Sequence, residues 1–430
     1  MRLKPVLASI ILLGISGSAF AATNSNVNVQ NQLNGMQSQI NSMEQVINQN
    51  NGMTQTMGGT ALQQRIAACP NWYDSISVSG LINVDAVLSD GDLNYSNRSD
   101  SDLTLSNADL FVDAQVNNWT KAHIGLNYQT NNNTSLNNFR SIPADQSLII
   151  KPQASDFIDE AYVTFANFCE NPFFLRVGKQ YVNFGNYDRF ATVPSFTQLL
   201  TETNETAATL GFVSNGFYGS VYTFRGLTSR RDTGNGVINI NDFGGNLGWS
   251  MQGQDAKLNL QASYLNNMAD TDYIGGGFAA NGIPLAITGY SHPVNGVSVD
   301  ATGSIGMFDG FVHVVSALND FSNADAPSTP PGNDGATPGA LDVGAGLTFN
   351  IMDHKSRVGA DYQYSWDARN IGLIGVGIPR QRIEGTFDVN VSRNVVVGLD
   401  VFNDDDYDRD DGGTGRNKTT GVLHLGVMFA

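Results

Sequence analysis

Apolar side chains occupy every second position along most of this chain. Between Ile76 and Leu88 they alternate with Ser, Asn and Asp, and the same pattern recurs to the C-terminus. A period of two is typical of a β-strand with one apolar and one wet face. The sequence therefore predicts an all-β fold of about sixteen strands. The expected strands lie near residues 76–88, 108–116, 122–128, 157–165, 173–181, 207–212, 217–224, 243–251, 256–264, 297–307, 311–318, 341–349, 358–366, 383–391, 395–401 and 421–429.

The links between these strands alternate in length. Residues 117–119 and 214–216 form short links, whereas residues 129–156 and 266–295 form long polar ones. Short turns at one end and long loops at the other are typical of transmembrane antiparallel β-barrels, and a soluble sandwich has no reason to separate them. Aromatic residues also gather at both strand ends, which fits the two girdles of a membrane barrel better than a general preference of aromatics for strands.

The first residues indicate export. A short basic start is followed by an apolar stretch to Ile15 and by Ala19-Phe20-Ala21, which fits the small-x-small rule for signal cleavage. A retained membrane anchor is disfavoured, because the apolar stretch is shorter than the roughly 18 residues that span a bilayer. We expect a signal peptide at residues 1–21, a periplasmic coiled-coil segment and linker at residues 22–68, and the barrel at residues 69–430.

A short helical seam precedes the barrel. Apolar residues between positions 29 and 47 are spaced alternately four and three apart, which is the pattern of a coiled coil. About three heptads are marginal in water, so the helix should form only where several copies associate. A disordered polar linker remains the alternative. The seam consists of Val29, Leu33, Met36, Ile40, Met43 and Ile47.

Charge and composition exclude several function classes. The chain has 23 Lys and Arg against 40 Asp and Glu, a formal net charge of −17, which disfavours a nucleic-acid partner. Two cysteines are too few for a disulfide scaffold or a cysteine-built metal site, and we expect no cofactor. Five scattered histidines without a catalytic motif argue against an enzyme. They are His123, His292, His313, His354 and His424.

The inner face of such a barrel would be charged. About sixteen strands enclose a lumen wide enough for water, and dense charges are tolerated only where they are hydrated or paired. An acidic excess on the wall predicts a weak preference for cations. A closed lumen, crossed by ion pairs and plugged by loops, remains the alternative. The wall residues singled out are Asp109, Asp113, Lys121, Asp361 and Asp388.

The last strand carries the most specific resemblance. Gly421, Leu423, Leu425, Val427 and Phe429 alternate and end in an aromatic residue, as in the terminal signal of outer-membrane barrels. The chain resembles Gram-negative outer-membrane porins, and more narrowly the porin-like proteins of gammaproteobacteria that carry an N-terminal periplasmic coiled coil. The resemblance implies a homotrimer in the cell outer membrane, in contact with lipid and lipopolysaccharide and inserted by the barrel-assembly machinery. It also implies extracellular long loops and passive diffusion of small hydrophilic solutes and ions.

Porins fold the loop after their fifth strand into the lumen, and residues 182–206 occupy that place here, with Phe184-Gly185 echoing the family motif. The resemblance thus implies a constriction in which loop carboxylates face wall arginines. A loop that stands at the surface remains the alternative. So does a different function, a surface adhesin or interaction protein for which the barrel is only an anchor. The constriction candidates are Asp188, Glu202 and Glu205 on the loop, and Arg176, Arg357 and Arg382 on the wall.

Cys69 and Cys169 are expected at the same end of the barrel. Counting strands from a periplasmic N-terminus places both on the periplasmic side, where thiols can oxidise. We therefore expect a disulfide between them. Two independent thiols remain the alternative, because counting strands fixes only the side and not the distance.

Overall fold

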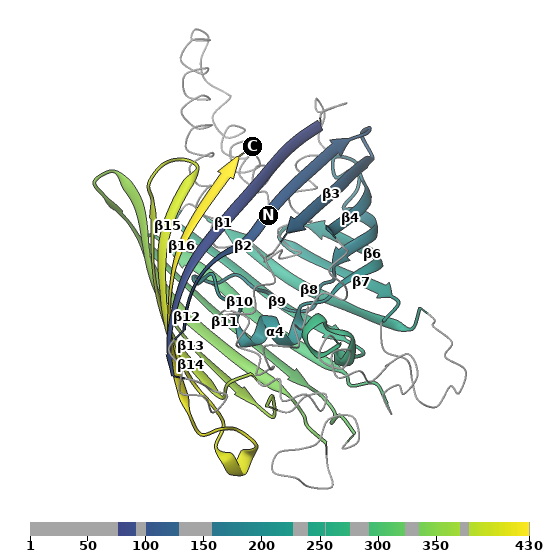
Figure 1. Ribbon diagram of the computed structural model, residues 1–430. Helices are drawn as coiled ribbons and strands as arrows, with labels where there is room; N and C mark the ends of the chain where they lie inside the picture. Colours follow the sequence, from purple (N-terminus) through teal and green to yellow (C-terminus); the bar gives the residue numbers. More distant parts are fainter. Residues whose placement is uncertain are drawn as a thin grey trace.

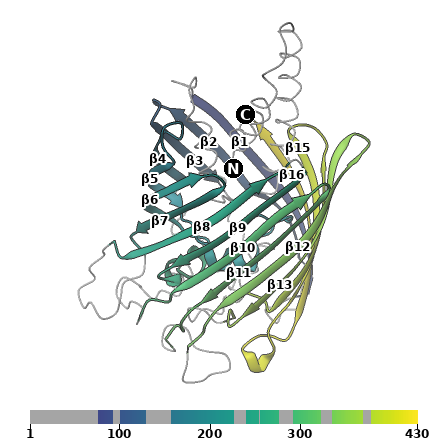
Figure 2. The same cartoon turned by 180° about the vertical axis from the view of Figure 1, so that it is seen from behind.

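The computed structural model describes residues 76–91, 100–128, 157–226, 240–253, 255–275, 292–322, 335–369 and 378–429. They form a closed antiparallel barrel of sixteen strands, in which β16 pairs with β1 and every other strand pairs with its neighbours in sequence (Figures 1 and 2). The predicted fold class and strand number are confirmed. The strands are β1 (Ile76–Gly91), β2 (Asp100–Gln115), β3 (Thr120–Tyr128), β4 (Ile158–Ala166), β5 (Phe173–Tyr181), β6 (Asn204–Ser214), β7 (Phe217–Phe224), β8 (Asp242–Gln252), β9 (Ala256–Leu265), β10 (Gly296–Ile305), β11 (Phe308–Ala317), β12 (Gly339–Ile351), β13 (His354–Trp366), β14 (Gln381–Asn390), β15 (Val395–Asp405) and β16 (Asn417–Phe429).

The connections differ in length at the two ends of the barrel, as expected. Asn215-Gly216 joins β6 to β7 in two residues, and both have positive φ (49° and 83°), which suits the twist of a tight hairpin. The long connections lie at the other end, for example between β9 and β10. One boundary differs from expectation: β1 and β2 each have 16 residues, so the first long connection shrinks to residues 92–99. Leu103 lies on the outer face and extends the alternation of β2 toward this loop.

The burial pattern is the reverse of that in a soluble protein. On β6 and β7 the outward residues Leu210 and Val221 are 54% and 63% exposed, although they are apolar. The inward Gln180 and Thr209 on β5 and β6 are both fully buried. An apolar outside and a polar inside are what a barrel in a lipid bilayer requires. Among the described residues, no helix has the length and apolar character needed to cross a membrane.

One connection lies inside the barrel. Residues 182–203, here called the inner loop, run between β5 and β6 and include the short helix α4 (Phe196–Thr201), which Figure 1 places within the ring of strands. The Ser195 side chain caps this helix by accepting a hydrogen bond from the backbone N–H of Gln198 (3.1 Å). Nearly all of α4 is buried.

The long-loop half of the barrel contains an apolar cluster. Inner-loop residues Phe184, Phe196 and Leu200 pack there with side chains from strands β6, β7, β9, β11 and β12 and from the long connections that follow β9, β11 and β13. The loops at this side therefore share one buried core with the barrel wall. The predicted signal peptide, the coiled-coil segment and Cys69 lie outside the described residues, so these assignments stay predictions.

Candidate functional site

The inner loop follows the barrel wall over more than half of its circumference. After leaving β5 it contacts the inner faces of β7, β8, β9, β11, β13, β14, β15, β16 and β1 in turn, and α4 then returns along β13 and β12. A segment held at this many points is part of the lumen structure. The contacts that fix its path include Asn183 Nδ2 with Asn246 Oδ1 (3.0 Å), Gly185 N with Ser263 Oγ (3.0 Å), Asp188 O with His313 Nε2 (3.0 Å) and Thr192 N with Asp400 Oδ2 (3.0 Å).

Arg189 at the middle of the inner loop joins two wall carboxylates. Asp361 on β13 and Glu384 on β14 lie directly opposite each other in the strand pairing. Like charges in that position repel unless a cation lies between them. Arg189 Nη2 supplies it, 3.0 Å from Asp361 Oδ2 and in contact with Glu384 Oε2, and all three side chains are at most 2% exposed. Burial lowers the pKa of Arg189, but Glu384 and Asp361 raise it by more, so the guanidinium stays charged.

The next residue, Phe190, fills a hollow made by glycines. Its ring lies against Gly346 and Gly359, 5.0 Å from the ring centroid of Phe311, and the guanidinium of Arg357 lies 4.1 Å from its centroid. A Cβ atom at Gly359 would stand 2.9 Å from Phe190. The absence of side chains at these two wall positions lets the loop approach the backbone.

The returning part of the loop is fixed by Arg382 on β14. This guanidinium donates to the Pro194 carbonyl (3.2 Å) and to Asp404 Oδ1 on β15 (2.7 Å). It also lies 5.0 Å and 4.6 Å from the ring centroids of Phe196 and Phe402. The planar guanidinium thus combines cation–π contacts to two rings with hydrogen bonds to a carboxylate and to the loop backbone.

The predicted loop carboxylates lie in different surroundings. Asp188 lies within electrostatic range of Arg357; burial raises the pKa of Asp188, whereas His313 and Arg357 lower it. Glu202 accepts a hydrogen bond from Gln198 in the preceding turn (2.7 Å). Glu205 is not on the loop, because β6 begins at Asn204.

The predicted wall arginines also differ from one another. Arg357 faces the loop through Phe190, and its Nε lies 3.9 Å from Asp309 Oδ2. Arg382 pairs with Asp404 on the neighbouring strand and meets the loop through a carbonyl group, not through the predicted carboxylates. Arg176 on β5 stacks over the ring of Tyr162 at 4.5 Å. The structure therefore brings together Asp188 and Arg357 from the predicted set.

The predicted wall residues lie on the inner face, mostly in hydrogen-bonded pairs. Asp361 pairs with Arg189, and Lys121 on β3 is half-buried. The remaining contacts are Asp109 Oδ1 with Asn127 Nδ2 (2.5 Å), Asp113 Oδ1 with His123 Nδ1 (2.6 Å) and Asp388 Oδ1 with His424 Nε2 (3.0 Å).

Several residues of the inner loop and its wall were not anticipated. Arg189 and Phe190 follow Asp188 directly, but only the carboxylate was singled out from the sequence. His313 and His424 seemed scattered, although the alternation of their strands places both on the inner face. In the described parts of the chain, no three His, Cys, Asp or Glu side chains are grouped to hold a metal ion.

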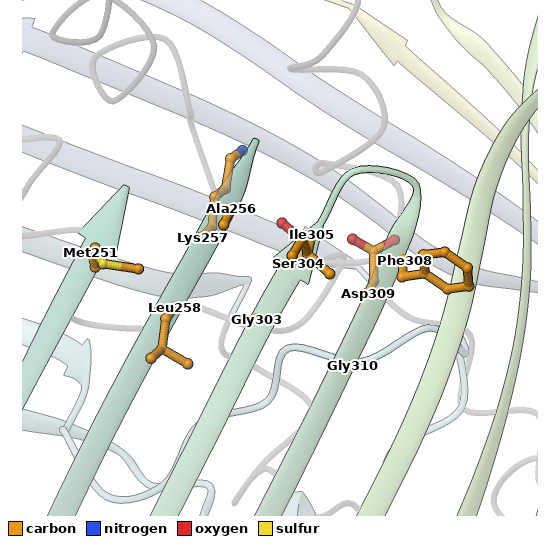
Figure 3. A pocket seen from close by; sticks show the side chains of 10 residues that line it. All are labelled: Met251, Ala256, Lys257, Leu258, Gly303, Ser304, Ile305, Phe308, Asp309 and Gly310. Atoms are coloured by element: carbon orange, nitrogen blue, oxygen red, sulfur yellow. The ribbon is translucent and has the colours of Figure 1, made fainter. Parts of the chain in front are cut away.

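A shallow hollow lies at the short-turn end of the barrel. It lies at the ends of β8 to β11, where Lys257 and Asp309 flank Ser304 on adjacent strands (Figure 3). Its lining is mostly apolar, and few polar groups converge on it, unlike a solute-binding pocket. The inner loop therefore remains the candidate site. The side chains that line the hollow include Met251, Lys257, Leu258, Ser304, Ile305, Phe308 and Asp309.

Comparison with known proteins gives two kinds of match. No family model matches the chain. A UPF0422 protein of Coxiella burnetii is 25% identical over 329 residues, which cover 76% of this chain and 64% of the relative. A UPF0422 protein of Legionella pneumophila strain Lens is 24% identical over 337 residues, covering 73% and 56%. The chain thus spans about three fifths of the length of these relatives.

Solved structures with the same fold include outer-membrane channels and porins. OmpF of Salmonella typhi in complex with daunomycin has a TM-score of 0.52 at 12% identity, covering 84% of this chain and 99% of that one. The outer-membrane channel DcaP of Acinetobacter baumannii has a TM-score of 0.51 at 11% identity, covering 83% and 98%. An anion-selective porin from Comamonas acidovorans has a TM-score of 0.50 at 12% identity, covering 83% and 100%. The resemblance to porins is confirmed at the level of fold.

Proposed function

We propose that this chain is an outer-membrane channel through which small hydrophilic solutes and ions diffuse passively. The observation that carries the proposal is the charged inner loop inside a closed barrel of sixteen strands. Eight strands would suffice to anchor surface loops, and their interior would be filled by side chains. A wide barrel with a polar wall and a loop that narrows it is suited to conduction with a size limit.

We also propose a weak preference for cations. Carboxylates outnumber basic groups around Arg189: Asp342, Asp361, Glu384 and Asp400 all act on its guanidinium, and Arg382 is a second guanidinium that acts on Glu384. An acidic excess on a pore wall raises the local concentration of cations over anions. The preference should weaken as salt screens these charges.

Reconstitution in planar bilayers tests both statements. The purified protein should give stepwise conductance, and reversal potentials in a salt gradient should indicate cation preference at low salt. Bilayers with detergent alone are the control. Complete absence of conductance would favour the adhesin, and a clear anion preference would mean that the arginines control the narrow section.

The surroundings proposed for the channel follow from its fold and from the porin resemblance. The barrel would lie in the outer membrane among lipid and lipopolysaccharide, after insertion by the barrel-assembly machinery. The short turns and the N-terminal segment would face the periplasm, and the long loops would be extracellular. A homotrimer, with the seam at residues 29–47 joining three copies, is the proposed assembly.

The disulfide between Cys69 and Cys169 is proposed on the same grounds. Cys169 lies in the short turn between β4 and β5, at the end where β1 begins at Ile76. The seven residues from Cys69 to Ile76 can extend about 23 Å, and four strand spacings from β1 to β5 measure about 19 Å. The bond is therefore within reach.

Peptide mapping without reduction should recover the peptides of Cys69 and Cys169 as one linked species. A Cys69→Ser variant, in which the linked species must vanish, is the control. Free thiols at both positions in protein from an oxidising periplasm would contradict the proposal.

A further inference from the structure

His313 holds the inner loop through a contact on each side of its ring. On β11, its Nδ1 lies 3.1 Å from Asp300 Oδ1 of β10, and its Nε2 lies 3.0 Å from the backbone carbonyl of Asp188. The side chain is 1% exposed and stacks on Phe311, with ring centroids 5.1 Å apart. Both nitrogens of this imidazole therefore face oxygen atoms in a buried site.

These contacts determine how many protons the site needs. A carbonyl can only accept, so Nε2 must carry a hydrogen to bind Asp188. An ionised Asp300 also only accepts, and its other oxygen already accepts from Ser298 Oγ (2.9 Å). Either Nδ1 also carries a hydrogen, or Asp300 itself is protonated. In both cases the pair holds one proton more than a neutral histidine beside an ionised aspartate.

We propose that His313 is a proton-dependent positioning residue that fixes the inner loop while the His313–Asp300 pair retains this proton. If the proton is lost, one of the two hydrogen bonds is replaced by repulsion between lone pairs. The repulsion lies between Nδ1 and Asp300, or between Nε2 and the Asp188 carbonyl. The anchor is thus complete at low pH and weakens as pH rises. Its effect on conductance rests on the proposed channel function, but the anchoring itself does not.

Carboxylates on every element next to His313 favour the protonated pair. Asp300 on β10 and Asp342 on β12 lie directly across from His313 in the strand pairing, and Asp188 belongs to the loop that covers it. Two cations act on these carboxylates: Arg357 on Asp188, and Arg189 on Asp342. Three carboxylates around one imidazole favour its charged form.

His424 provides a matched comparison at the far end of the same loop segment. Its Nε2 lies 3.0 Å from Asp388 Oδ1, and its Nδ1 lies 3.3 Å from the hydroxyl of Thr192. A hydroxyl can donate as well as accept. A neutral His424 therefore keeps both contacts. Asp388, Asp400 (4.0 Å from Nδ1) and Asp85 favour a second proton on the ring, but neither contact requires one.

Hydrogen exchange of the folded full-length protein tests the proposal without relying on conductance. The amide of Asp188, which donates to the non-titrating side chain of Asn186 within the loop, should exchange roughly tenfold faster at about pH 9 than at about pH 6 after correction for intrinsic rates. Amides in the paired strands β8 and β9 serve as internal references and should stay protected.

Two substitutions should remove this pH dependence in different ways. Asp300→Asn can donate to a neutral Nδ1, so the loop should stay protected at both pH values. His313→Gln does not titrate, so protection should be equal at both pH values. His424→Gln is the control: it should lower protection at both pH values and retain the pH dependence.

The outcomes separate this inference from the proposed function. The role of His313 would be overturned if hydrogen exchange of the loop were independent of pH in the unmodified protein. It would also be overturned if the Asp300→Asn variant kept the pH dependence. A pH-dependent loop in a protein without conductance would support the anchor and contradict the channel. Conductance combined with pH-independent exchange would support the channel and contradict the anchor.

Discussion

Replacing Arg189 with methionine should detach the inner loop from β13 and β14, with a loss of about 3–5 kcal/mol from the free energy of loop docking. The change leaves Asp361 and Glu384 buried and directly opposite each other without the cation between them. Hydrogen exchange of the Thr192 amide measures the effect locally, and single-channel conductance should rise and become noisier as the loop leaves the wall.

A charge-free variant is the control for this prediction. Arg189→Met combined with Asp361→Asn and Glu384→Gln removes the whole ion-pair group, and such replacements are often nearly neutral. Much of the lost protection should return. If the single variant keeps full protection, other contacts hold the loop and Arg189 is not its main anchor.

Phe190→Ala should have the second-largest effect, about 3–5 kcal/mol from the docked state of the loop. The ring is 3% exposed and packs on Phe311 and on the backbone of two wall glycines, so its removal leaves a cavity that these residues cannot close. The midpoint of loop release in a urea titration, followed by exchange of the Asp188 amide, reports the loss.

Phe243→Ala is the matched control, because this ring lies on the outer face of β8, is 53% exposed and lies beside the ring of Tyr264 on β9. It should leave loop protection unchanged. Equal effects of the two substitutions would mean that the measurement reports the whole barrel and not the loop.

The architecture was accessible from sequence because its signals are local. Alternation along each strand, as in Ile76 to Leu88, and the alternating link lengths were enough to predict sixteen strands and the end at which the loops gather. The extension of β2 back to Asp100 was missed, although Leu103 already continued the alternation.

The site was less accessible because its contacts depend on register and on the direction of a loop. Arg382 is opposite Asp404 only in the observed pairing of β14 with β15, and a slip of one residue would turn it outward. Arg189 and Phe190 gain their roles because the loop bends inward onto Asp361 and Gly359, which lie about 170 positions later in the chain. No local pattern encodes such a distant contact.

Val193 of the inner loop bears on the order in which the protein folds. Its side chain packs with Val87 of β1, Phe402 of β15 and Val422 of β16, at the place where the two ends of the sheet meet. This docking site does not exist until the last strand has joined the first, so the loop should settle only after closure, as a late, long-range step. Once settled, it spans the join from within, and the join cannot reopen without first undocking the loop, which would slow unfolding more than it speeds folding.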